Sequence, residues 1–291
     1  MIKKSIYQKI VLAYIIFSFW GIFINKSTFS AFQNIFLISL FASVILVFIL
    51  WRNKSLNSLK TIKFNQTILL YAIVSGFGGV FWLKSLSLIP VSQALFLFSS
   101  VPVFVLIVEV IFLKQKLKLI TFLAVILGVL GIFTILSKEL LSQEITLLST
   151  GSLIVILASV MIALQVIFIK KISNNYRFEI IILILLLSQV IVSLFFAFQS
   201  PWNFNLYSIT VTFIMSVLAY VIAGYFYVDA LKFLRASTVR IIGYVEPLLG
   251  SLWGVILLGQ PLALTTIIGG FFILFASYLV VKSSEIASSN V

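Results

Sequence analysis

The stretch GYVEPLLGSLWGVILLGQPL, residues 243–262, decides how the rest of the chain is organised. It places a carboxylate, Glu246, beside a proline, Pro247, in an otherwise apolar segment. A second stretch, SVPVFVLIVEVIFLKQKL (residues 100–117), aligns with it without a gap at an offset of 145 residues, so that Pro102 matches Pro247. A duplicated apolar segment that is broken by proline and carries an acid is typical of the binding region of a membrane transporter.

Composition places the chain in a membrane. Of its 291 residues, 62% are hydrophobic and 9% are charged, with a mean hydropathy of +1.26, whereas soluble domains are roughly 45 to 50% apolar and about 25% charged. The chain has no cysteine and no histidine, and Asp229 is its only aspartate. Disulfides, thiolate or imidazole chemistry and a paired-aspartate protease are therefore excluded. Because the sequence also lacks a P-loop, we expect neither enzymatic activity nor a cofactor.

Ten apolar windows are each about as long as the roughly 20 residues that cross a bilayer. The longest connection, around residues 52–65, is too short to hold a soluble domain with its own core. The sequence therefore predicts an all-α integral membrane protein with ten transmembrane helices. The windows lie near residues 9–26, 31–51, 66–88, 92–113, 119–137, 149–170, 178–199, 206–231, 236–258 and 262–282.

The distribution of Lys and Arg predicts the orientation of these helices. With the N-terminus inside, 16 of the 20 basic residues fall on the cytoplasmic side, and only Lys26 and Lys138 fall outside. Such an excess marks cytoplasmic loops. We therefore expect both termini in the cytoplasm and a multi-pass protein of the cytoplasmic (inner) membrane. The same bias explains the net charge of +13, so no nucleic-acid partner is expected.

The internal repeat predicts an inverted architecture. Its offset spans five helices, and because five is odd, the second half must enter the membrane in the opposite direction. We expect one five-helix repeat over residues 1–140 and its inverted copy over residues 146–284. Inverted repeats support alternating access, which favours a carrier over a channel. Further matches at the same offset are Gly79 with Gly224, Phe81 with Phe226, Trp82 with Tyr227, Leu86 with Leu231 and Ser92 with Ser237.

Several short motifs accompany the repeat. They are Trp20-Gly21, the segment 151–171 with Ala158 and Ala163, the turn LSLIPVSQA and its counterpart LKFLRASTV, and two Pro-apolar-LxQ endings. In combination with length and helix count, they resemble the drug/metabolite transporter superfamily, EamA-domain type, over essentially the whole chain. Members of that family usually carry Glu where this sequence has Gln115 and Gln260, which keeps polarity and removes a charge.

The resemblance implies a secondary transporter of small metabolites. It places the substrate cavity among the third, fourth, eighth and ninth helices, with help from the first and sixth. Similar families export amino acids and related metabolites, and some exchange nucleotide-like compounds such as S-adenosylmethionine.

Ionisable groups inside the membrane cost roughly 2.5 to 3.5 kcal/mol each and are functional candidates by default. Glu246 lies near the predicted midplane, and Pro247 removes a backbone hydrogen bond, which we expect to free the carbonyl around Gly243. Together they suit an amine or a proton, although Glu246 as a structural clamp is the alternative. Arg240 either contacts a substrate carboxylate or snorkels to the cytoplasmic end.

Three further charges lie nearer the predicted membrane surfaces. Lys84 and Asp229 are repeat-equivalent and are candidates for gates, or are simple rim charges. Glu109 is either a gating or coupling residue or a partner of cytoplasmic lysines such as Lys114.

Uncharged polar and aromatic side chains form a second set of candidates. Trp20, Trp82, Tyr227 and Tyr244 either offer faces for a planar or cationic ligand or, like most of the abundant aromatic residues, face lipid or the membrane interface. The glycines at positions 76, 78, 79, 128, 131, 269 and 270 are expected to permit close helix packing. The polar residues of the spans are Asn25, Gln93, Ser99, Ser100, Gln165, Gln189, Tyr220 and Tyr244, of which Gln93 and Gln165 are preferred as substrate contacts.

These observations lead to one hypothesis and three alternatives. The hypothesis is a proton-coupled or exchanging secondary transporter of amino acids or related zwitterions, since such a substrate uses both Glu246 and Arg240. Efflux of lipophilic cations or drugs, which needs only Glu246, and exchange of nucleotide-like metabolites are alternatives within transport. A non-transporting membrane scaffold or sensor is the alternative from another class. Expected partners are a small-molecule substrate, protons and lipid, with the chain a monomer or homodimer.

Overall fold

The computed structural model describes residues 2–20, 23, 27–63, 65–86, 88–89, 91–116, 118–141, 149–258 and 264–289. The elements in these ranges are helical, without strands. They are α1 (Ile2–Ser18), α3 (Ala31–Arg52), η1 (Leu56–Thr61), α4 (Gln66–Leu86), α5 (Val91–Phe98), α6 (Val101–Leu113), α7 (Leu119–Ile135), α8 (Ser137–Leu141), α9 (Thr150–Ile172), α10 (Phe178–Ala197), α11 (Leu206–Met215), η2 (Ser216–Ile222), α12 (Ala223–Phe233), α13 (Ala236–Ile242), α14 (Val245–Leu258) and α15 (Leu264–Ser289).

The predicted all-α membrane fold is confirmed. Within the described residues, nine helical stretches are long and apolar enough to cross a bilayer, and α1 adds a shorter apolar segment, Ser5–Ser18. Most of the predicted windows agree with these helices to within a few residues, although α1 begins seven residues before its window. Large apolar side chains such as Val44, Ile191 and Phe271 lie exposed on the outer faces, as expected of surfaces that meet lipid.

Helix positions follow the internal repeat. α7 begins at Leu119 and α15 at Leu264, which are 145 residues apart, and α5 and α13 begin at the same separation. The packing is also paired across the halves, because α7 packs on α15, α3 on α10 and α6 on α13. The contact of α1 with α12 is the repeat counterpart of the contact between α4 and α9. The two halves are therefore interlocked.

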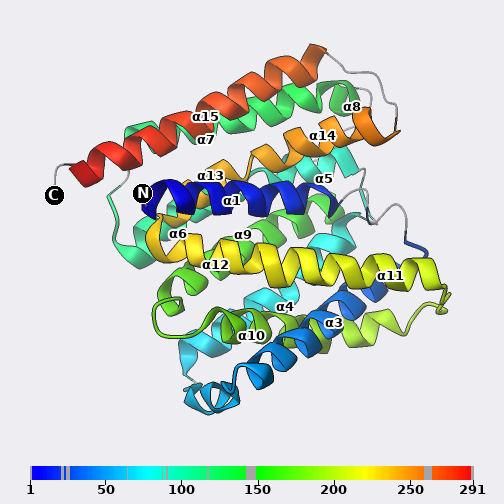
Figure 1. Cartoon of the computed structure of the whole chain (residues 1–291). Helices are drawn as coiled ribbons and strands as arrows, with labels where there is room; N and C mark the ends of the chain where they lie inside the picture. The colour runs from blue at the N-terminus through cyan, green and yellow to red at the C-terminus, as the bar shows by residue number, and fades with distance from the viewer. Residues whose placement is uncertain are drawn as a thin grey trace.

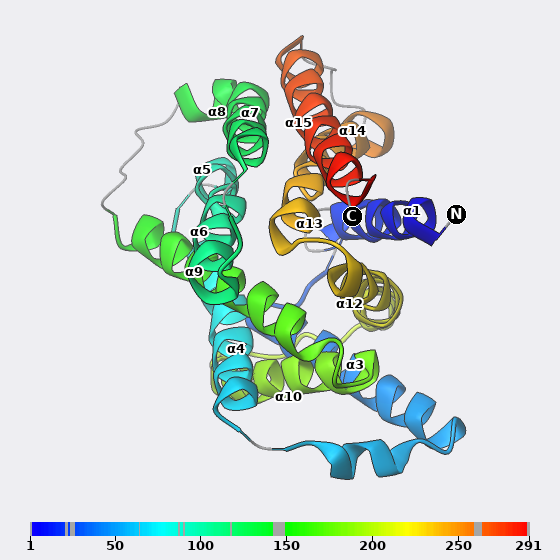
Figure 2. The ribbon, with the colours of Figure 1, turned by 90° about the vertical axis from the view of Figure 1, so that its left-hand side faces the viewer.

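The interlocked pairs form successive layers. Figures 1 and 2 place the α7–α15 pair at one edge of the bundle and the α3–α10 pair at the opposite edge, with α1, α9 and α12 between them. The start of α1 and the end of α15 lie at the same end of the bundle (Figure 1). A chain that crosses a membrane an even number of times must have its two ends on the same side, as these two helix ends do.

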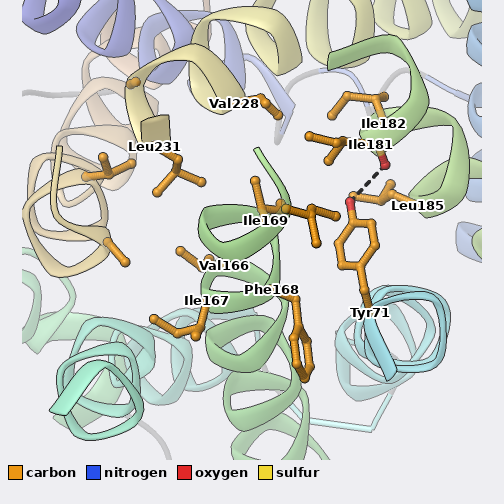
Figure 3. Close-up of a cluster of buried hydrophobic side chains, with 14 of the residues drawn as sticks. Tyr71, Val166, Ile167, Phe168, Ile169, Ile181, Ile182, Leu185, Val228 and Leu231 are labelled. Carbon is orange, nitrogen blue, oxygen red and sulfur yellow. Dashed lines mark hydrogen bonds between the residues drawn. The ribbon is translucent and has the colours of Figure 1, made fainter. Parts of the chain in front are cut away.

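The main core lies between α4, α9, α10 and α12. Ile167, Ile181 and Leu231 are fully buried in it (Figure 3). Tyr71 of α4 is also fully buried, and its hydroxyl donates a hydrogen bond to the Ile181 carbonyl of α10 at 2.9 Å (Figure 3). A buried phenol needs such a partner, and here it also ties the third span to the seventh.

Both proline-bearing spans are broken at corresponding places. The fourth span divides into α5 and α6 at Ser99–Ser100, with Pro102 in the first turn of α6, where a missing N–H costs little. The ninth span divides into α13 and α14 at Gly243–Tyr244, just before Pro247. The Tyr244 hydroxyl donates to the Ser99 carbonyl at 3.1 Å. A side chain at the break in the ninth span therefore satisfies a backbone carbonyl at the break in the fourth span.

The eighth span departs from the expected continuous α-helix. Its middle, η2, is a seven-residue π-helical segment between α11 and α12. Such segments are rare and occur often at functional sites. η2 carries Ala219 and Tyr220, and its position in the bundle brings both toward the cavity described below.

Glycines permit the close approach of α7 and α15. A Cβ placed on Gly131 would lie 2.7 Å from the Gly269 carbonyl oxygen and 2.8 Å from Ile273 Cγ1. A Cβ on Gly269 would meet the Gly131 carbonyl and Ile135. The prediction that these glycines serve helix packing is confirmed for this pair.

We expect Gly131→Ala to lower the free energy of unfolding by about 1 to 3 kcal/mol, because the new methyl group overpacks the α7–α15 contact. The matched control is Gly250→Ala, where a Cβ would meet only the Ser18 carbonyl at 3.9 Å. Thermal unfolding of the purified protein in detergent measures both. Equal midpoints for the two variants would contradict the packing role.

Candidate functional site

A cavity of about 190 Å³ lies among α1, α9, α10, η2, α12 and α13. Its described lining comes from the first, sixth, seventh, eighth and ninth spans, so the third and fourth helices, which the resemblance places at the substrate cavity, contribute no described residue to this one. All but one of these residues belong to the second half of the chain. The lining residues are Phe17, Gln165, Ile169, Ile182, Leu185, Gln189, Ala219, Tyr220, Gly224, Tyr227 and Arg240.

Arg240 is the cation among these lining residues. It lies on α13, and its Nε is buried without a hydrogen-bond partner. Tyr227, Tyr14 and Glu246 are near enough to interact with its charge. A guanidinium with an unused buried donor, facing a cavity, is suited to a planar anion such as a carboxylate.

Glu246 is partly buried at the start of α14 and is not among the described lining residues. It forms no ion pair within 4.0 Å with Arg240, although it is close enough for the two charges to interact. The expected free carbonyl at Gly243 is wrong, since that oxygen accepts the Glu246 backbone N–H at 3.0 Å. The backbone at the break between α13 and α14 therefore forms a tight turn that satisfies this carbonyl.

An aromatic corner borders the cavity beside Arg240. The rings of Phe17 and Tyr227 meet edge to face at 6.3 Å, and Tyr14 packs against both. The Tyr14 hydroxyl donates to the Val239 carbonyl at 2.9 Å. The Tyr227 hydroxyl is buried and forms no hydrogen bond of good geometry, but Arg240 and Tyr14 lie close enough to interact with it.

Two glutamines supply the remaining polar groups. Gln165 Nε2 donates to Ser75 Oγ at 3.2 Å, which leaves its carbonyl oxygen as an acceptor. Gln189 Oε1 accepts hydrogen bonds from Ser39 Oγ at 3.0 Å and from the Tyr220 hydroxyl at 3.2 Å. Sequence reasoning gave Gln189 and Tyr220 only second rank, and their polarity within apolar spans was the one signal available.

Four other predicted contacts have different surroundings. Gln93 is buried and donates to Ser152 Oγ at 3.0 Å. Trp82 stacks obliquely on Phe98 at 4.1 Å, and Trp20 packs against Phe23 and Tyr220. The Tyr244 hydroxyl donates its hydrogen bond to the Ser99 carbonyl, and its ring lies against Gly128. None of the four is among the described lining residues of the cavity.

The predicted gating residues lie at the ends of helices. Asp229 pairs with Lys9 at 2.7 Å, which joins α12 to α1. Glu109 is fully buried, accepts the Ala236 N–H at 3.1 Å and lies 3.6 Å from Arg235 Nε. Its ion-pair partner is Arg235 at the start of α13, and it also interacts with the charge of Lys170, so the predicted pairing with cytoplasmic basic residues holds, with Arg235 and Lys170 in place of Lys114.

Lys84 is exposed on α4. No group of three or more acidic side chains in the described ranges is placed to hold a metal ion. Gly21, Asn25 and Gln260 lie outside the residues that the structure describes.

We expect Tyr244→Phe to lower the free energy of unfolding by about 1 to 3 kcal/mol, because it leaves the buried Ser99 carbonyl without its donor. Tyr207→Phe is the matched control, since Tyr207 is exposed. Detergent-solubilised protein is unfolded thermally for both variants. A normal midpoint for Tyr244→Phe together with a raised KM for transport would instead assign the hydroxyl to the substrate.

Comparisons with known proteins agree with the fold. A solved structure described as "Crystal structure of protein" matches with a TM-score of 0.82 over 95% of this chain and 96% of that chain, at 13% identity, which shows a shared fold. No curated protein sequence matches significantly. A sequence model of the EamA-like transporter family matches residues 5–137 and again residues 149–282. The match spans both halves, and the chain belongs to the EamA-like transporter family.

Proposed function

We propose that this transporter moves small carboxylate-bearing metabolites, amino acids foremost, by alternating access, and that the cavity beside Arg240 holds the substrate. The observation that carries the proposal is the buried, unused Nε of Arg240 at a cavity whose described lining includes no carboxylate. Phe17, Ile182 and Leu185 provide an apolar surface for the body of the substrate.

The energetics of a buried charge support a carboxylate substrate. A guanidinium inside the membrane is costly unless an opposite charge is near. Glu246 provides that charge at long range, without a direct ion pair. A substrate carboxylate would meet the guanidinium directly through charge-assisted hydrogen bonds, which are about twice as strong as neutral ones.

Glu246 then has two possible tasks in the same cycle. Once a carboxylate neutralises Arg240, the Glu246 carboxylate is free to take a proton or to attract the ammonium group of an amino acid. Either task keeps the region close to neutral, as the membrane interior requires. We propose coupling to protons or to a counter-substrate on this basis.

Proteoliposome uptake and counterflow test the proposal. With a panel of radiolabelled amino acids, we expect Arg240→Gln to reduce uptake at least about 100-fold, because removing one partner of a buried charge pair costs several kcal/mol. Glu246→Gln should retain counterflow of substrate but lose its response to an imposed pH gradient. Arg52→Gln is the control, since it removes an exposed charge at the end of α3.

The outcomes separate the alternatives. Full amino-acid transport by Arg240→Gln would overturn the carboxylate site. Transport of lipophilic cations that depends on Glu246 alone would establish cation efflux. Failure of the wild type to move any amino acid or nucleotide-like compound, with or without a pH gradient, would favour a scaffold or sensor.

We further propose that both termini lie in the cytoplasm of a cell bounded by a single or inner membrane. The chain has no native cysteine, so single cysteines report topology directly. Lys60→Cys should react with a membrane-impermeant maleimide only after permeabilisation, whereas Ser200→Cys should react in intact cells. The reverse pattern would invert the topology.

A further inference from the structure

The ends of α6 and α9 and the turn between α12 and α13 meet at one end of the bundle. Glu109 of α6 is fully buried there, and its Oε1 accepts the backbone N–H of Ala236 at 3.1 Å. The same oxygen lies 3.6 Å from Arg235 Nε. Arg235 Nη2 in turn donates to the Lys116 carbonyl, in the connection after α6, at 3.3 Å. The fourth span and the connection that follows it therefore hold the start of the ninth span.

A lysine of the sixth span holds the same turn. Lys170 Nζ, near the end of α9, donates to the carbonyl oxygens of Lys232 at 3.2 Å and Leu234 at 2.8 Å. Because the last carbonyls of a helix have no partner within it, the ammonium group satisfies the end of α12. The charges of Lys170 and Glu109 are close enough to interact. We call Glu109, Lys170 and Arg235 the latch.

The latch lies beside the cavity on the same helices. Lys170 directly follows the lining residue Ile169 on α9, and Arg235 comes five residues before the lining residue Arg240. Leu234, in the turn that the latch holds, is 4% exposed and packs in the main core. Movement of α9 away from this turn would open the cavity toward this end of the bundle. The contacts of the latch oppose that movement.

The inverted repeat does not copy the latch at the opposite end of the bundle. Equivalent segments of an inverted repeat lie at opposite ends. The counterparts at the repeat offset are uncharged: Gly254 for Glu109, Pro90 for Arg235 and Asn25 for Lys170. The two ends of the bundle therefore differ in the contacts that must break when each one opens.

The latch is also able to open. Arg235 is 22% exposed, and neither its Nε nor Glu109 Oε2 forms a hydrogen bond with the described residues. Desolvation of a buried ion pair offsets much of its attraction. The latch therefore biases a conformational equilibrium without fixing it.

We propose that Glu109, Lys170 and Arg235 form a gate that holds the cavity closed toward the cytoplasm. The inference rests on the alternating access and the cytoplasmic termini of the proposed function, and is independent of the identity of the substrate. Loss of a latch charge then shifts the population toward the state that is open to the cytoplasm.

Accessibility of a cavity thiol tests the latch, since the chain has no native cysteine. The probe is Gly224→Cys, because Gly224 lines the cavity and a Cβ there would meet Ile182 Cδ1 at 3.4 Å, an ordinary contact. Its reaction with the membrane-impermeant reagent sulfonatoethyl methanethiosulfonate is followed in inside-out and right-side-out membrane vesicles. The face from which Lys60→Cys reacts defines the cytoplasmic side.

In the Gly224→Cys background, we expect Glu109→Gln to raise the labelling rate from the cytoplasmic face about five- to tenfold, without a rise from the outer face. Glu179→Gln is the matched control, because Glu179 is also a buried carboxylate in an ion pair, but its partner Arg177 is only two residues away in the chain. The control should change labelling by less than about twofold.

A second variant keeps the test decisive if Glu109→Gln does not fold. Arg235→Gln removes a partly exposed member of the latch and should raise cytoplasmic labelling in the same way. Its control is Lys171→Gln, which removes an exposed charge at the same end of α9.

The latch and the proposed substrate fail in different ways. Unchanged labelling in the folded latch variants, or an equal rise from both faces, would overturn the latch and leave the carboxylate site at Arg240 standing. A selective cytoplasmic rise in a protein that moves no amino acid would support the latch and overturn the proposed substrate.

Discussion

The structure depends on satisfying backbone groups where two membrane spans are broken. In hydrocarbon no water is available to an exposed N–H or C=O, so each break must find partners inside the protein. Here the fourth and ninth spans break at corresponding places and pack on each other. Tyr244 donates to the Ser99 carbonyl, Tyr14 donates to the Val239 carbonyl, and Gly243 bonds to the Glu246 N–H. These contacts hold α13 and Arg240 beside the cavity.

Much of this frame could be predicted from the sequence because membrane thickness and proline chemistry act locally. Apolar length fixed the spans to within a few residues for α3, α7 and α10. Pro102 and Pro247 marked the two breaks because proline cannot continue the hydrogen-bond ladder. The 145-residue register predicted the matching positions of helices such as α7 and α15, since each half repeats the same element lengths.

The cavity was less predictable because the direction of a side chain on a uniformly apolar helix leaves no periodic signal. Gln189 faces the cavity whereas Gln93 faces Ser152, and nothing in their sequence neighbourhoods separates them. The π-helical segment η2 shifts the register within the eighth span, which places Tyr220 against Gln189. The Gly243 carbonyl, expected to be free, is taken by a turn that proline placement alone does not specify.

The two halves contribute differently to the site despite their common frame. At the repeat offset, Leu95 stands where Arg240 stands, Val44 where Gln189 stands, and Trp20 where Gln165 stands. Each polar lining residue of this set thus has an apolar counterpart, and Val44 is 61% exposed on the outside of the bundle. If the two halves exchanged conformations, these polar lining residues would move with the second half, because the first half has no equivalents of them. Under the proposed function, the repeated frame supports alternating access, and these unmatched residues of the second half select the substrate.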